Sequence, residues 1–157
     1  MKNIFFLSPL FFSIFLNATI EIITERGLSF GTNSPSNIQN IKIPKLCINA
    51  DNKSNIAKIR FQHDYYEKYA LVTVNWTIPD KLVNEYGEEV SFKKQIGWCD
   101  DSTNGNVEFI TDWKEGKYKG HGIDKKFHNL YIGGEIFSKN KTLRGNYSGI
   151  INISISY

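Results

Sequence analysis

The sequence predicts an all-β fold, a sandwich or a barrel built from eight or nine short strands. One observation is the C-terminal stretch, where residues from Tyr147 onward alternate between a mostly apolar row and a mostly polar row. A period of two residues indicates a β-strand with one buried face. The other observation is that shorter alternating segments recur along the chain between turn residues, and that no segment has a convincing helical pattern.

Residues 1–18 are typical of a secretory signal peptide, because Lys2 is followed by an apolar run from Ile4 to Leu16. The run is too short to cross a bilayer as a helix. Cleavage is expected after Ala18, and an uncleaved anchor is the alternative. Residues 19–157 then form a single β-domain, since a chain of this size builds one core more readily than two. Nothing after residue 18 resembles a transmembrane helix.

The first half of the domain contains four predicted strands. Residues 19–24 form the first, with two isoleucines on one face. The second ends at Pro44, because proline donates no ladder hydrogen bond. Residues 51–55 and 80–89 are polar or charged and are interpreted as loops. The apolar residues that alternate in these four strands are Ile20 and Ile22; Ile41 and Ile43; Ala57, Ile59 and Phe61; and Val72, Val74 and Trp76.

The second half continues with strands at residues 90–98. Asn104–Gly105 is the strongest hairpin signal in the chain, since both residues tolerate positive φ, and residues 107–111 are the expected return strand. Residues 114–129 are charged and glycine-rich, and a strand with Leu130 and Ile132 follows. The last strand is predicted to turn one row of side chains inward, and this row consists of Tyr147, Gly149, Ile151, Ile153, Ile155 and Tyr157.

The chain has two cysteines, Cys47 and Cys99. An isolated pair in an exported protein usually bonds, so the sequence predicts a disulfide; two buried free thiols are the alternative. A metal site is not expected, because neither cysteine has a histidine or another cysteine at ligand spacing.

Catalytic motifs are missing from the sequence, and we predict neither an enzyme nor a bound cofactor. The three histidines, His63, His121 and His128, form no metal-binding unit and are interpreted as surface or packing residues. The net charge of +3 is too small to indicate nucleic acid. A local basic cluster is interpreted as a solvated loop, with an anionic partner as the alternative, and its lysines are Lys117, Lys119, Lys125 and Lys126.

Aromatic residues are frequent, and two roles are open to them. Trp76 and Trp98 are expected to fill the core, as large aromatic side chains do. Tyr65, Tyr66 and Trp113 are the candidates for an exposed platform on which a sugar could stack.

Short motifs at the two ends of the domain resemble a known family. L-x-F-G occurs at Leu28, Phe30 and Gly31. L-x-I-G-G-x-I spans residues 130–136 and contains Gly133 and Gly134, and G-x-Y-S-G spans residues 145–149 and begins with Gly145. The chain resembles a bacterial family of small exported β-proteins of unknown function, which is similar to alpha-type fimbrial subunits and coat-U-like secreted pilins. The resemblance covers these two ends, and the central residues 44–128 depart from the pattern.

The resemblance implies an immunoglobulin-like, pilin-like sandwich that is exported to the periplasm and assembled on the cell surface. Such subunits resemble an open sandwich, whose missing strand comes from a periplasmic chaperone and later from a neighbouring subunit at an outer-membrane usher. The last strand would then border an apolar groove. A structural or adhesive fibre subunit is therefore expected, and a self-contained surface or secreted domain that binds a glycan or a protein is the alternative.

Overall fold

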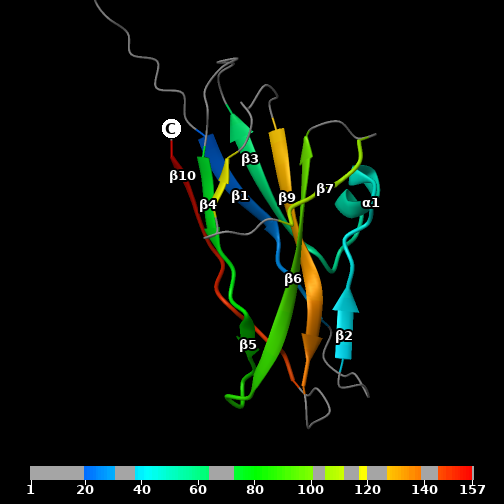
Figure 1. The fold of residues 1–157 in the computed structure, drawn as a ribbon, viewed down its shortest axis with the longest axis vertical. Coiled ribbons are helices and arrows are strands. Elements are labelled where there is room, and N and C mark those ends of the chain that lie inside the picture. The colour runs from blue at the N-terminus through cyan, green and yellow to red at the C-terminus, as the bar shows by residue number, and fades with distance from the viewer. Residues whose placement is uncertain are drawn as a thin grey trace, which may run out of the picture.

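The computed structural model describes residues 20–30, 38–63, 73–100, 105–111, 117–119, 127–138 and 145–156. These residues form two antiparallel β-sheets and one short helix (Figure 1). The expectation of a mostly β protein is therefore confirmed. The expected signal peptide, the Gly31 end of the L-x-F-G motif and Tyr157 lie outside the described residues.

The larger sheet has seven strands, and its centre is the pair β6 (Glu89–Asp100) and β9 (Phe127–Phe137). This ladder runs from the Ser91–Phe137 pair to the Asp100–His128 pair. The remaining strands flank it: β3 (Ala57–His63) and β1 (Ile20–Arg26) on the β9 side, β5 (Lys81–Val83) at the β6 edge, β2 (Ile38–Ile41) beside β9, and β7 (Glu108–Phe109) beside β6.

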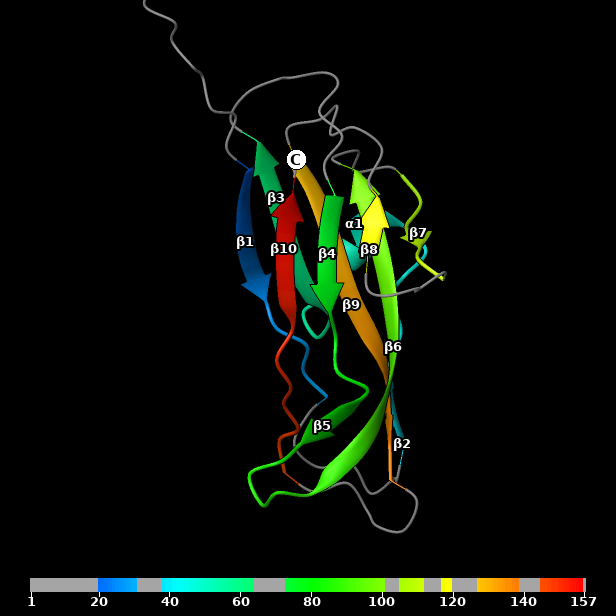
Figure 2. The same ribbon diagram turned by 60° about the vertical axis from the view of Figure 1, so that its left-hand side comes forward.

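The smaller sheet has three strands in the order β10 (Asn152–Ser156), β4 (Thr73–Thr77) and β8 (Lys117–Lys119). It lies across one face of the larger sheet (Figure 2). The main core fills the space between the sheets, because alternate residues of β3, β6 and β9 meet Val74, Trp76 and Ile78 there. Trp76 and Trp98 are both buried in this core, as their size predicts.

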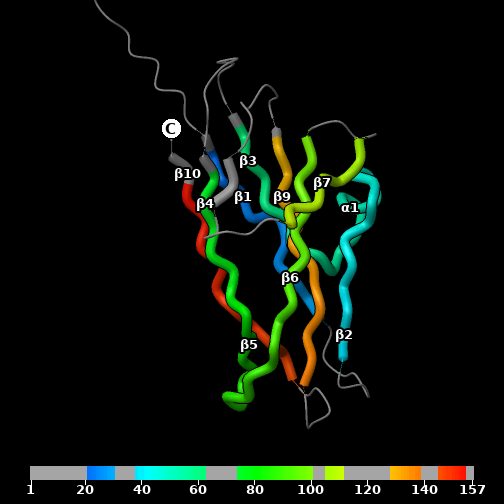
Figure 3. Tube along the Cα trace, viewed as in Figure 1, coloured from blue at the N-terminus to red at the C-terminus, as the bar shows by residue number. Residues whose placement is uncertain are grey.

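The opposite face of the larger sheet is covered by the segment around α1 (Cys47–Asp51), which lies away from β4 and β10 (Figure 3). Tyr131 and Cys99 point into this second, smaller core together with Ile41, Ile43 and Ala50. The central strands are therefore buried on both faces. The helix corrects the expectation of a chain without helices; with one turn of five residues, it is too short for a periodicity signal to reveal it.

Several segment predictions also change. Residues 80–89 contain β5 instead of forming only a loop, and residues 114–129 contain β8 and the start of β9. A two-residue turn at Asn104–Gly105 would pair Trp98 with Thr111, but Trp98 pairs with Glu108. A return strand, β7, is therefore present within the predicted residues 107–111, but it pairs with β6 in a register that a two-residue turn would not give. The physical reason is a competing partner, since Asn106 bridges to Leu46 and the Val107 amide donates to the Lys45 carbonyl.

Candidate functional site

The described part of the chain contains an apolar groove of about 440 Å³. It lies between β1 and the C-terminal segment, with β3, β5 and β6 at its floor. Among the described residues that line it, Arg26 is the only charged one. The apolar side chains that shape it include Ile22, Ile59, Leu82, Phe92, Ile151 and Ile153.

The groove exists because two edge strands border it without pairing with each other. In the described residues, β1 pairs with β3 alone and β10 with β4 alone. The facing edges therefore carry backbone donors and acceptors that no described strand satisfies. Ile22 on β1 remains 40% exposed, although its cross-strand neighbour Phe61 is fully buried. An edge of this kind can receive a further extended segment.

The C-terminal row forms one wall of the groove. Ile151 and Ile153 are half-buried and face it, whereas Asn152 and Ser154 are exposed, so the predicted alternation holds over these residues. The row was predicted to face the core, and its described members Tyr147, Ile151 and Ile153 do pack against the main core. The same residues also border the groove, together with Gly149. The Ile155 side chain lies outside the described part.

The regular strand begins later than predicted, at Asn152 instead of Tyr147. Before it, Ser148 and Val83 form an isolated bridge with two backbone hydrogen bonds of 2.9 Å. Gly145 has φ +76°, and a Cβ there would lie 2.6 Å from a carboxylate oxygen of Glu85. Glycine is therefore needed where this segment turns against Glu85.

The described residues of the L-x-F-G motif contribute to the same groove. Leu28 and Phe30 are half-buried, line the groove and pack against the main core. The Phe30 ring meets Phe92 edge-on at a centroid distance of 5.9 Å. In the other motif, a Cβ on Gly133 would lie 2.5 Å from the Ile41 carbonyl oxygen, so this glycine lets β2 approach β9. Gly134 follows it in β9.

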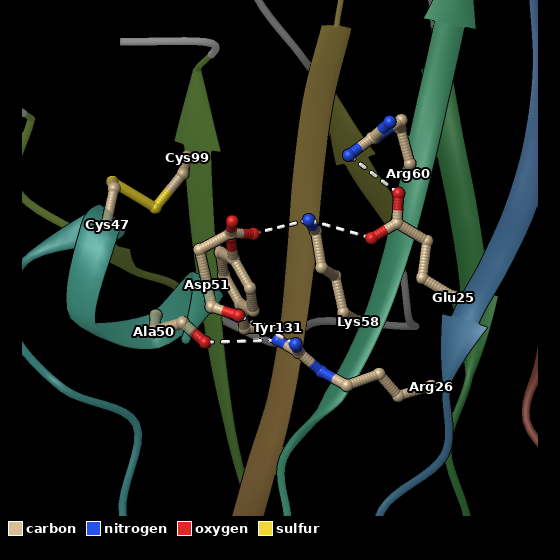
Figure 4. Close-up of polar contacts among 9 residues, drawn as sticks. All are labelled: Glu25, Arg26, Cys47, Ala50, Asp51, Lys58, Arg60, Cys99 and Tyr131. Carbon is tan, nitrogen blue, oxygen red and sulfur yellow. Dashed lines mark hydrogen bonds and ion pairs between the residues drawn. A yellow bond between two sulfur atoms is a disulfide. The ribbon is translucent and has the colours of Figure 1, made fainter. Parts of the chain in front are cut away.

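A cluster of charged residues lies beside the groove, and the sequence analysis did not identify it (Figure 4). Lys58 of β3 is only 3% exposed and bridges Glu25 of β1, at 2.7 Å, and Asp51 of α1. Arg60 also pairs with Glu25, at 2.6 Å. The alternating pattern of β3 assigns Lys58 to a solvent face. In the structure the segment around α1 covers that face, and two carboxylates pair with the buried ammonium group.

The cluster also fixes the end of α1. The guanidinium of Arg26 donates to the carbonyl oxygens of Asp51, at 2.6 Å, and Ala50, at 3.1 Å. The Tyr131 hydroxyl donates to the Asp51 carboxylate at 3.1 Å.

Asp51 and Tyr131 titrate away from their ordinary values. Partial burial opposes ionisation of Asp51, but the hydrogen bond and charge of Lys58 outweigh it and hold the pKa of this carboxyl below its ordinary value. Burial, together with the Asp51 charge, raises the pKa of Tyr131. Both groups therefore keep their ordinary charge states at neutral pH.

The predicted disulfide is present and joins Cys47 of α1 to Cys99 of β6, with the two Cα atoms 5.9 Å apart. It closes the chain over a separation of 52 residues. Both cysteines are buried in the smaller core.

Several of the remaining candidates lie outside the described residues. Tyr65, Tyr66, Trp113, His121, Lys125 and Lys126 lie outside the described residues, while Lys117 and Lys119 belong to β8. His128 is buried, stacks near Trp98 and lies 2.9 Å from Asp100, which suits a packing role. Within the described ranges, no group of acidic, histidine or cysteine side chains could hold a metal ion, and no helix is long and apolar enough to cross a membrane.

Comparisons with known proteins add no further constraint. No protein-family model matches the chain, and no curated protein matches it. The fold and the groove therefore carry the functional argument.

Proposed function

We propose that the chain is an exported, pilin-like subunit of a bacterial cell-surface fibre, with a structural or adhesive role, and that it is assembled by β-strand complementation. In this proposal the two sheets form an incomplete immunoglobulin-like sandwich. A periplasmic chaperone, an outer-membrane usher and neighbouring subunits are its partners. The observation that carries the proposal is the apolar groove between the edges of β1 and β10.

The groove suits an extended strand better than a compact polar ligand. Its lining is apolar apart from Arg26 and a few small polar residues, and it is bordered by two unpaired edges. β1 and β10 run in opposite directions (Figure 2). A strand inserted between them would therefore be parallel to one and antiparallel to the other, with alternate side chains entering the groove.

The first strand also bears on the place of this subunit in a fibre. Polymerisation needs a donor segment, and residues 20–26 pair with β3 instead. Because this segment is already a strand of the larger sheet, it is not free to act as a donor strand. This pairing favours a terminal or non-polymerising subunit over a repeating one.

A self-contained secreted or surface binding domain is the second candidate. The groove volume of about 440 Å³ falls within the range of ligand pockets. An apolar protein segment is then the favoured ligand. A glycan would need the aromatic platform at Tyr65, Tyr66 and Trp113, and a glycan array with the Tyr66→Ala and Trp113→Ala variants would test it.

The decisive experiment measures binding of a fluorescein-labelled synthetic peptide that alternates isoleucine with threonine. Residues 19–157 should bind it, and Ile22→Asp should abolish binding. The matched control is Ile38→Asp, because Ile38 is 48% exposed on β2 and lies outside the groove. Without peptide, we expect the protein to self-associate. A stable monomer in the absence of peptide would contradict strand complementation and favour the binding-domain alternative.

A further inference from the structure

Helix α1 connects the disulfide to the wall of the groove (Figure 4). Its first residue, Cys47, is bonded to β6, and its last residue, Asp51, contacts Arg26 and Lys58. Arg26 belongs to β1 and also lines the groove. A covalent bond on one side of the molecule is thus linked, through five residues, to the strand that borders the groove on the other.

The groove end of β1 depends on these contacts more than the rest of the strand does. The register between β1 and β3 shifts between Thr24 and Arg26, so the regular ladder is interrupted there. On its other side, β1 has no partner among the described strands. The ion pairs of Glu25 and the two hydrogen bonds of Arg26 are therefore the side-chain contacts that hold this end in place.

The helix cannot hold its own position. It has five residues and no side-chain cap at its N-terminus, and an isolated helix of this length is unstable in water. The Cys47 amide donates to the Gly105 carbonyl at 2.9 Å, and the adjacent Leu46 bridges to Asn106. Besides these backbone bonds and the packing of Cys47 and Ala50 in the smaller core, the disulfide is the covalent connection that holds the start of α1 against the sheet.

We propose that the Cys47–Cys99 disulfide controls the groove through α1. When the bond is intact, α1 holds Arg26 and Lys58, and β1 keeps the edge that receives a strand. A dithiol reductant transfers two electrons and two protons to the bond, which gives two thiols and the oxidised reductant. α1 then loosens, the end of β1 loses its side-chain contacts, and the groove no longer binds a strand. Binding of a strand rests on the function proposed above, whereas the effect on β1 does not.

The test uses Arg26→Met and Arg60→Met in the oxidised protein. Methionine keeps an apolar stem at the groove wall but cannot donate to the carbonyls of α1. Arg60→Met is the matched control, because it also removes a guanidinium group, here one that pairs with Glu25 of β1, but leaves the contact of Arg26 with α1 intact. Hydrogen exchange of the β1 amides and binding of the isoleucine–threonine peptide are both measured, and wild-type protein treated with dithiothreitol is the third sample.

Arg26→Met and reduction should each speed exchange at residues 22–26 and weaken peptide binding by about tenfold, a common size for coupling between two sites. Exchange in β6 and β9 should stay slow in Arg26→Met. Arg60→Met should change exchange and binding less than Arg26→Met does, because Lys58 still pairs with Glu25. If reduction unfolds the whole protein, the amides of β6 and β9 also lose protection. The Arg26→Met variant then decides whether the contacts between α1 and β1 control the groove. Wild-type exchange and affinity in Arg26→Met would overturn the proposal. If no form binds the peptide but exchange responds as expected, strand complementation fails and the link from α1 to β1 stands.

Discussion

Replacing Ile153 by aspartate tests the assignment of the C-terminal strand, with Ser154→Asp as its matched control. Ile153 is half-buried, faces the groove and lies directly opposite the buried Trp76, whereas Ser154 is exposed opposite Asn75. Full burial of an isoleucine contributes roughly 1.5–3 kcal/mol, so about half of this is lost in Ile153→Asp. A carboxylate against an apolar wall costs roughly another 1–3 kcal/mol.

Ile153→Asp should therefore lower the free energy of unfolding by about 3 kcal/mol, which corresponds to a fall in Tm of roughly 10 °C for a domain of this size. Ser154→Asp should change the free energy by no more than about 0.5 kcal/mol, because its side chain points to solvent and faces no like charge. Urea unfolding followed by tryptophan fluorescence measures both, since Trp76 and Trp98 are buried. Equal stabilities with equal m-values would refute the strand assignment.

Three further predictions concern the disulfide and the charged cluster. Mass spectrometry of the unreduced protein should show one Cys47–Cys99 bridge. Reduction of this bridge should lower the free energy of unfolding by at most about 4 kcal/mol for a loop of this length. Cysteines that can be alkylated in the native protein without reduction would contradict the prediction. Lys58→Met should destabilise the fold by roughly 3 kcal/mol, because it removes the buried cation that pairs with both Glu25 and Asp51, whereas Lys53→Met removes only an exposed hydrogen bond. Chemical denaturation of both variants should separate them, and an equal loss of stability would count against the cluster. The pKa of Asp51 in the folded protein lies below its ordinary value of 3.8, so the stability that its ionised carboxylate contributes is present above that pH and is lost as the pH falls through the folded pKa. The free energy of unfolding should therefore depend less on pH, on the acid side, in Asp51→Asn than in the wild type. Identical curves of stability against pH would exclude this contribution of Asp51.

The sequence by itself determined the local features of this protein. Alternation has a period that one strand specifies alone, so β1, β3, β4, β6 and β9 could be predicted from their apolar residues. The disulfide followed from the count of cysteines and the expected export. In each case the physical cause lies within a few neighbouring residues or in the compartment, and no knowledge of distant contacts is needed.

Only the tertiary structure decided which segments meet. The Asn104–Gly105 signal was outweighed by the contacts of Asn106 and Val107 with residues 45 and 46, and such competition is invisible in a local pattern. Lys58 is buried because β1 and α1 bring two carboxylates to it. The groove itself depends on which strand edges have no partner among the described strands. The alternating sequence pattern does not show this, because it is the same for a strand that closes a core and for one that borders a groove.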